Sequence, residues 1–201
     1  MNDLEAMKTR QIVAENVKLG ISSLHSWIKC FECLLHISYR LGTKKWFVRR
    51  TDRPVVDSRK KEVQEKIRRQ MRLLVDAPKP GFGTSNDGNT ARAFFRNPEI
   101  VSSITGIDEI IIKKLHVVLT IIACGYEIDA QKLKEFCLTT AELYVALYPW
   151  YYIFQSLHKV LIHGGLLVND SILPIGQMSE EAIEARNKDS KYFRITLVNS
   201  T

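Results

Sequence analysis

Long apolar runs are missing from this sequence, and their absence argues against a membrane-spanning helix. Such a helix needs about 18 or more consecutive apolar residues. Residues 110–123 come nearest but are interrupted by Lys113 and Lys114, whereas residues 144–154 are too short and contain Pro149. The first ten residues also lack the apolar core that a signal peptide requires. We therefore expect an intracellular protein with no membrane segment.

Cysteine, proline and glycine are scarce, with four, six and ten residues in a chain of 201. Without a secretory signal, four cysteines favour reduced thiols over a disulfide framework. Strand signals are weak, and the sequence has no internal repeat and no low-complexity tract. Because 45% of the residues are hydrophobic, the chain is long enough to bury a real core. These features indicate one or two compact domains that are mainly helical.

Apolar periodicity and capping residues predict where the helices lie. The clearest begins near Ser23 and ends at Gly42, with apolar side chains recurring at helical spacing. Asp108, Asp129 and Thr90 are expected to cap three others. Residues 76–90 are rich in glycine and proline and are expected to hold no regular structure. The predicted helices cover residues 2–20, 23–42, 58–75, 91–95, 98–103, 108–124, 129–148, 156–163 and 180–193.

Positive charge is concentrated in one stretch. Residues 40–72 hold thirteen lysines and arginines and four acids, a local charge of +9 that exceeds the net charge of +7. Such a cluster favours an anionic partner, either nucleic acid or an anionic membrane face. Arginine outnumbers lysine there, and its planar fork suits phosphate. A solvated helix face explains the cluster equally well. The residues that we predict to contact a DNA backbone are Arg59, Lys60, Lys66, Arg68, Arg69 and Arg72.

Two further segments could contact nucleic acid. The glycine-rich residues 80–89 lack the Gly-Lys-Ser/Thr ending of a nucleotide-binding loop, so a plain turn with a helix cap is at least as consistent with them. The aromatic residues between Tyr148 and Tyr152 could stack on bases, although aromatic side chains more often serve burial.

His158 and His163 form a His-x-x-x-x-His pair. Five residues along an ideal helix correspond to a rotation of about 500°, so both rings reach one metal only where the helix breaks or unwinds. Gly164 and Gly165 are expected to close the helix immediately afterwards. Two partly buried polar side chains are the alternative. Similarly, residues 179–188 agree with an ordinary helix start that has a serine cap and acids in its first turn.

The order of several short strings along the chain is more informative than any of them alone. It resembles the C-terminal part of RAG/Transib-type DDE transposases, the family of the catalytic subunit of the V(D)J recombinase and its Transib relatives. The strings that carry the resemblance are Leu24-His25, Asp87-Gly88-Asn89-Thr90-Ala91-Arg92, residues 158–163 with both histidines, Asp170-Ser171-Ile172, Ser179-Glu180 followed by Glu184, Asn187 and Lys188, and Phe193-Arg194.

The resemblance implies an RNase H-like core in which two aspartates and one glutamate hold two divalent ions, Mg²⁺ or Mn²⁺, for attack on a phosphodiester. Glu184 matches the glutamate, with Glu180 and Glu181 as neighbouring alternatives. His158 and His163 match two ligands of a structural zinc ion whose other ligands are a Cys-x-x-Cys pair. Asn89 and Arg92 fall in the helical insertion, near the DNA end.

The aspartates and zinc cysteines of the family lie upstream of the segment that Leu24-His25 matches, and only 23 residues precede that segment here. Cys30 and Cys33 form a Cys-x-x-Cys pair, but they lie on a predicted helix in a different segment, so we do not expect zinc there. One glutamate cannot hold Mg²⁺ alone. The isolated chain is therefore expected not to cut DNA.

The predicted architecture is mainly α. A helical insertion-like region covers residues 1–150, with its basic face over residues 40–75. Residues 151–201 would be the C-terminal segment of an incomplete RNase H-like core that retains only its final helix. The expected function is that of a C-terminal part of a nuclear DNA transposase or recombinase. Its expected partners are transposon-end-like duplex DNA and either a missing N-terminal part or a second copy. The alternatives are a domesticated DNA-binding protein without catalysis and a helical protein-interaction module.

Overall fold

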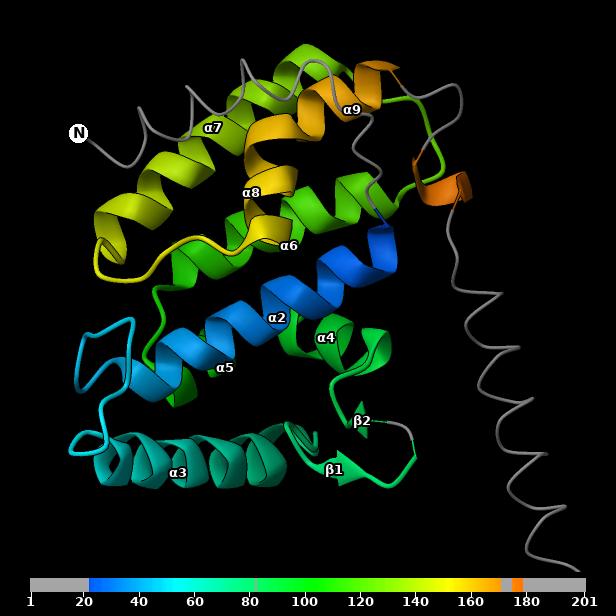
Figure 1. Cartoon of the computed structure of the whole chain (residues 1–201). Helices are drawn as coiled ribbons and strands as arrows, with labels where there is room; N and C mark the ends of the chain where they lie inside the picture. The colour runs from blue at the N-terminus through cyan, green and yellow to red at the C-terminus, as the bar shows by residue number, and fades with distance from the viewer. Residues whose placement is uncertain (1–21, 82, 171–174, 179–201) are drawn as a thin grey trace, which may run out of the picture.

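The computed structural model describes residues 22–81, 83–170 and 175–178 (Figure 1). This part of the chain is mainly helical, as the sequence predicts, and the helices predicted at residues 2–20 and 180–193 lie outside it. The elements are α2 (Ser23–Arg40), α3 (Arg53–Met71), β1 (Pro78–Lys79), β2 (Gly83–Thr84), α4 (Gly88–Phe95), α5 (Pro98–Thr105), α6 (Glu109–Ala123), α7 (Ala130–Leu147), α8 (Gln155–His158), the π-helical turn η1 (Lys159–His163), α9 (Gly164–Asp170) and the 3₁₀ turn η2 (Ile175–Met178).

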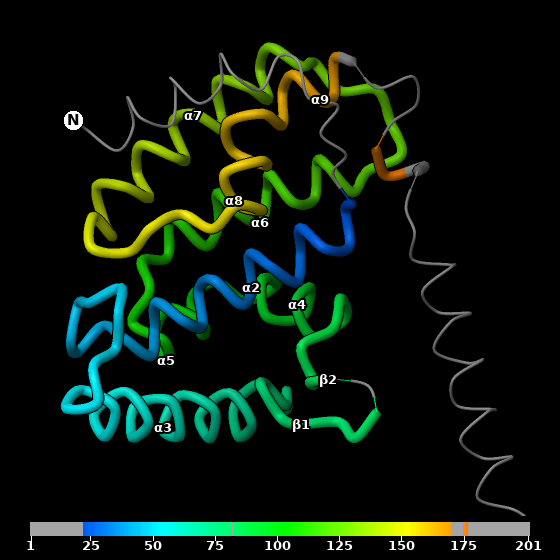
Figure 2. Tube along the Cα trace, viewed as in Figure 1, coloured from blue at the N-terminus to red at the C-terminus, as the bar shows by residue number. Residues whose placement is uncertain are grey.

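Helix α2 runs through the middle of the fold and contacts α3, α4, α6 and α8 (Figures 1 and 2). Phe31, Leu34 and Leu35 of its apolar stripe are fully buried. The stripe predicted from the sequence is therefore the centre of the core. Burial of each such side chain contributes on the order of 1.5–3 kcal/mol to folding.

The aspartates predicted to begin α6 and α7 do so. The Asp108 carboxylate accepts hydrogen bonds from the backbone N–H groups of Ile110 and Ile111 at 2.9 and 3.1 Å. Asp129 does the same for the second and third residues of α7 at 3.1 and 3.0 Å. These bonds satisfy donors that have no partner inside the helix. The predicted bounds of both helices are correct to within one residue.

Helix α3 begins and ends earlier than predicted. It starts at Arg53 rather than Ser58 because Pro54 occupies its first turn, where the missing N–H costs nothing. It ends at Met71, and Arg72 follows with a left-handed φ of 56°. Val63 and Ile67 are buried, whereas Leu74, inside the predicted helix, lies beyond its observed end and is 56% exposed.

Regular structure is also present where the glycine-rich loop was expected to have none. Strands β1 and β2 form a small antiparallel hairpin in which Pro78 lies opposite Thr84. Gly81 and Gly83 have φ values of 77° and 80°, which favour glycine, and so allow the turn. Helix α4 begins at Gly88 and is capped by Asp87, not Thr90; the Asp87 carboxylate accepts from the Thr90 N–H at 2.9 Å.

Gly164 and Gly165 do not end a helix, contrary to prediction. The chain passes from α8 through η1 into α9 as one continuous helical path, and the two glycines begin α9 (Figure 2). A Cβ atom on Gly165 would lie 2.6 Å from the Cβ of Lys134 and 3.0 Å from the carbonyl oxygen of Ala130. Glycine at this position therefore lets α9 pack closely against α7.

Among the residues that the structure describes, no helix is long and apolar enough to cross a membrane.

Candidate nucleic-acid interface

Helix α3 lies along one edge of the molecule, outside α2 and α5 (Figure 1). Only Val63 and Ile67 of its nineteen residues are buried, so most of its charged side chains face solvent. This helix carries five of the six cations that the sequence predicted to contact a DNA backbone, and the sixth, Arg72, follows its last residue directly. Their partners within the fold separate them into two groups.

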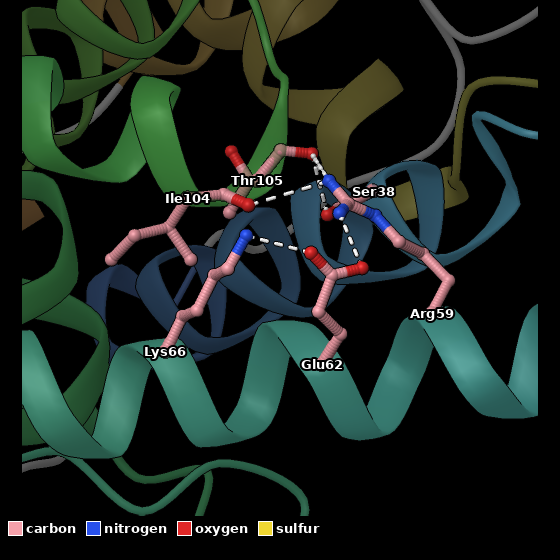
Figure 3. A network of polar contacts seen from close by, with 6 residues as sticks. All are labelled: Ser38, Arg59, Glu62, Lys66, Ile104 and Thr105. Carbon is pink, nitrogen blue, oxygen red and sulfur yellow. Dashed lines mark hydrogen bonds and ion pairs between the residues drawn. The ribbon is translucent and has the colours of Figure 1, made fainter.

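Arg59 connects α3 to α2 and α5 (Figure 3). Its Nη2 donates to the carbonyl oxygens of Ile104 and Thr105 at 3.3 and 3.2 Å, and the Thr105 oxygen also accepts from Ser38 Oγ at 2.8 Å. The bonds satisfy carbonyl groups at the end of α5 that have no partner inside that helix. Arg59 is therefore committed to the fold.

Glu62 brings two of the predicted cations together on α3 (Figure 3). Its carboxylate accepts from Lys66 Nζ at 2.6 Å and from Arg59 Nη1 at 2.8 Å. The hydrogen bonds from Lys66 and Arg59 lower the pKa of Glu62 to about 2. Lys66 is therefore partly neutralised by its own helix.

Lys60 belongs to a polar cluster around Asp76 that sequence reasoning missed. Asp76 Oδ2 lies 3.0 Å from Lys60 Nζ and accepts from the Tyr39 hydroxyl at 3.0 Å, while Oδ1 accepts from Asn86 Nδ2 at 2.6 Å. Burial alone would raise the pKa of Asp76, but the hydrogen bonds from Asn86, Lys60 and Tyr39 outweigh it, so the pKa lies below the usual value of an aspartate. The cluster joins α2 and α3 to the segment before α4. The only sequence signal was an Asp and an Asn flanking a turn.

Arg68 and Arg72 form the second group. Arg69 is paired with Glu65 at 2.6 Å, one turn earlier on the helix. Arg68 and Arg72 are exposed, and neither has an ion pair or a side-chain hydrogen bond within the described part of the chain. Lys61 shares these properties and lies about two turns before Arg68 and about three before Arg72, at the spacing of one side of the helix. Four of the six predicted cations are thus engaged, and two are available to a ligand.

A second set of cations lies in the loop between α2 and α3. Lys44, Arg49 and Arg50 are exposed and have no ion pair among the residues described. Lys45 is paired with Asp52 at 3.0 Å. Arg53, the first residue of α3, is also exposed and continues this set. The positive surface therefore extends from the loop onto the outer side of α3.

The aromatic segment that follows α7 divides between core and surface. Tyr148 and Tyr151 are buried, in line with the structural alternative given for this segment, whereas Tyr152 is 64% exposed. Trp46 packs against this segment, and its ring centroid lies 4.7 Å from that of Tyr151 and 5.3 Å from that of Tyr152. The loop after α2 and the segment after α7 consequently form one surface.

Asn89 and Arg92 lie on α4, a different helix from the main basic surface. Asn89 is exposed in the first turn. Arg92 is half-buried, and its guanidinium lies 5.7 Å above the ring of Trp27, where the ring face attracts a cation. Packing thus holds Arg92 in place.

The turn η1 brings together two residues that an ideal helix would separate. In a π-helical turn, residues five apart lie nearly above one another, and the rings of His158 and His163 meet with centroids 5.2 Å apart. His163 is only 5% exposed, and burial, with Lys159 nearby, lowers its pKa. The sequence prediction required local unwinding for this pair to meet, and a π turn supplies it.

The histidine pair alone does not complete a zinc site. Tetrahedral zinc takes four ligands, and no group of three or more His, Cys, Asp or Glu side chains that could hold a metal occurs in the described ranges. Cys30 and Cys33 lie on the buried stripe of α2, as expected from the sequence. Burial raises the pKa of Cys33 to about 12, which disfavours the thiolate that zinc binds. Within the described residues, the two histidines and the two cysteines therefore do not come together as one four-ligand site.

Comparison with known proteins adds no relative: no protein-family model and no curated protein matches the chain. Glu184, Glu180 and Glu181 lie outside the described residues. The geometry therefore supports a cationic surface built from α3 and the loop before it, whose available arginines include Arg68 and Arg72.

Proposed function

We propose that this chain is a C-terminal part of a RAG/Transib-type DDE transposase or recombinase that acts in the nucleus and binds duplex DNA. The order of strings from Leu24-His25 to Phe193-Arg194 supports the family assignment. In this proposal α2 to α7 belong to the helical insertion, and the segments after residue 150 belong to an RNase H-like core.

The observation that carries DNA binding is the set of available arginines on α3. Arg68 and Arg72 extend into solvent without intramolecular partners in the described chain, and Lys61 lies on the same side. A DNA duplex presents one phosphate about every 3.4 Å of helix axis along each strand, and neutralising each one releases counterions. Because Arg59 and Lys60 hold α3 against the fold, the free cations sit on a fixed support.

The test is a salt titration of binding to a fluorescent duplex by anisotropy. The variant Arg68→Glu with Arg72→Glu is expected to lower the affinity about tenfold or more and the salt slope by about 2, because each phosphate contact contributes about 0.9 to that slope. Lys132→Glu is the matched control, since its side chain is 83% exposed on α7. An unchanged affinity and slope in the double variant would contradict the proposal. Binding with no salt dependence would favour a helical protein-interaction module.

Cleavage is tested separately. Glu184 is the one metal-binding carboxylate that the resemblance assigns to this chain, and one glutamate cannot hold Mg²⁺ alone, so we expect no nicking of supercoiled DNA by the isolated chain with Mg²⁺ or Mn²⁺. Metal-dependent nicking that disappears in Glu184→Gln would overturn this expectation. Binding without nicking agrees both with a part of a longer enzyme and with a domesticated DNA-binding protein.

A further inference from the structure

The loop after α2 is held in a defined shape. Arg40, the last residue of α2, donates from Nη1 to the carbonyl oxygen of Trp46 at 2.7 Å, and its guanidinium lies 5.9 Å from the Trp46 ring and 5.6 Å from the Tyr151 ring. The backbone N–H groups of Thr43 and Lys44 donate to the Arg40 carbonyl at 3.0 and 2.8 Å. The loop is thus anchored at its start and at its tryptophan.

Two aromatic rings next to this anchor remain in water. Phe47 follows Trp46 directly and is 74% exposed, and Tyr152, whose ring touches Trp46 edge-on, is 64% exposed. Neither ring contributes substantially to the core. Exposed rings of this size on a rigid support are typical of surfaces that bind another molecule.

Unpaired cations flank Phe47 in the sequence of the loop. Lys44, Arg49, Arg50 and Arg53 are all exposed and carry no ion pair within the described chain. The only acid in residues 44–53 is Asp52, which is paired with Lys45. The loop therefore combines ring faces with positive charge that nothing in the described fold neutralises. We call Lys44, Phe47, Arg49, Arg50 and Tyr152 the aromatic loop surface.

This combination fits one kind of ligand. Phosphates match the arginines, and flat bases match the rings, but a duplex hides the faces of its bases in the stack. An unpaired strand presents both groups at once, and base stacking on aromatic side chains is the main attraction in such complexes. A membrane surface is a poorer match, because interfacial anchors bury a larger apolar face than one phenylalanine and one tyrosine provide.

We propose that the aromatic loop surface binds an unpaired strand of DNA, with Phe47 and Tyr152 stacking on bases and the loop cations contacting phosphates. The inference rests on the proposed function, which gives DNA as the ligand, and adds that the bound strand is unpaired. The positive surface would then have two parts: α3 for the duplex, and the loop for a strand separated from it.

The experiment measures binding of the full chain to three fluorescent probes: a twelve-residue thymidine strand, a strand of equal length made of abasic sites, and a duplex. Wild type is expected to bind the thymidine strand about tenfold or more tightly than the abasic strand, which has the same phosphates but no bases. Phe47→Ala with Tyr152→Ala should remove this preference and leave duplex affinity unchanged. Arg49→Ser with Arg50→Ser should weaken binding to both single strands.

The controls separate stacking from damage to the fold. Tyr126→Ala removes an aromatic side chain that is 81% exposed between α6 and α7, and it should change nothing. Phe47→Trp with Tyr152→Phe retains both rings and should retain the preference for bases. Equal binding of the abasic and thymidine strands by wild type would overturn the proposal. The proposal would also be overturned if the chain bound phosphatidylserine vesicles more tightly than the thymidine strand and the strand did not compete with the vesicles.

Failure of the two proposals can be told apart. If duplex binding is unaffected by Arg68→Glu with Arg72→Glu while the thymidine strand depends on Phe47 and Tyr152, the duplex surface is wrong and the strand surface stands. If Arg68→Glu with Arg72→Glu weakens duplex binding while binding of the thymidine strand does not depend on Phe47 and Tyr152, only the strand surface is wrong. A uridine strand of equal length is the last probe. If the chain bound it more tightly than the thymidine strand, the surface would be assigned to RNA and the DNA assignment would be overturned.

Discussion

Helix α3 and the turn η1 are attached to the same core by opposite means. Four of the five residues of η1 are buried, and the following α9 packs closely on α7 through Gly165. Helix α3 buries two of nineteen residues and is held additionally by polar links from Arg59 and Lys60. One region is fixed by apolar packing, whereas the other depends on a few charged side chains and keeps most of its surface in water.

This difference bears on what each region can bind. His158 and His163 lie against each other in a packed setting, whereas cations on α3 that have no partner in the described fold are available to a ligand. Substitutions should therefore have large effects on stability at α9, moderate effects at the links of α3, and very small effects on its outer surface.

The largest effect is expected for Gly165→Ala. The added Cβ would lie 2.6 Å from the Cβ of Lys134 and 3.0 Å from a backbone oxygen, neither of which can move freely. We expect a loss of about 2 to 3 kcal/mol in the free energy of unfolding. Gly164→Ala is the matched control, since its Cβ would meet only Cys137 Sγ at 4.0 Å; alanine there should be neutral or stabilising by up to about 1 kcal/mol. Urea denaturation measures both, and equal values would show that α9 does not depend on close packing.

Those parts of the fold that local chemistry determines were predictable from the sequence. The apolar stripe of α2 and the aspartate caps of α6 and α7 depend on neighbouring residues, so periodicity and capping rules located them. Some local signals were misinterpreted, among them the cap of α4, which is Asp87 and not Thr90. Helix α3 was expected to begin at residue 58, although Pro54 lies in its first turn, and Gly165 was expected to end a helix, although it allows a close contact with α7.

The candidate site was predictable only as a region of charge. Which cations are available depends on partners distant in sequence: Arg59 bonds to carbonyls of α5, and Lys60 bonds to Asp76. Periodicity contains no information on such pairs. The sequence predicted that His158 and His163 meet only if the helix breaks or unwinds. It could not predict the π turn that brings them together, because no rule predicts a π turn from a single sequence. The role of Glu184 remains a prediction.

The next largest effect is expected for Arg59→Ala. Its loss leaves the carbonyl groups of Ile104 and Thr105 without the charged donor, and such bonds contribute on the order of 1.5 kcal/mol when partly shielded from water. Arg59→Lys should recover only part of this, because an ammonium group lacks the planar fork. Lys61→Ala on the outer face is the control and should be nearly neutral. A loss for Arg59→Ala no greater than that for Lys61→Ala would show that packing alone holds α3.

Asp76→Asn is expected to cost about 1 kcal/mol near neutral pH, because it removes the charge that Lys60 faces. Since folding lowers the pKa of Asp76, its stabilising contribution is present above the pKa of the unfolded chain and is lost as the pH falls through the folded value. The difference between wild type and variant should therefore be full at pH 7 and shrink below about pH 4. Urea denaturation at several pH values measures it. A difference that stays constant down to pH 2.5 would exclude a contribution from this charge.

The smallest effect is expected for the pair of Glu65 and Arg69 on the outer side of α3. Their atoms lie 2.6 Å apart, but both side chains are largely exposed, at 47% and 76%. Water and salt screen such a pair, so a double-mutant cycle with Glu65→Gln and Arg69→Gln should give a coupling of only about 0.3 to 0.5 kcal/mol. The coupling should fall further in 1 M salt, where the screening length is about 3 Å. A coupling above about 1 kcal/mol would mean that the outer side of α3 is stabilised by its ion pairs, and that removing them to bind DNA would weaken the helix itself.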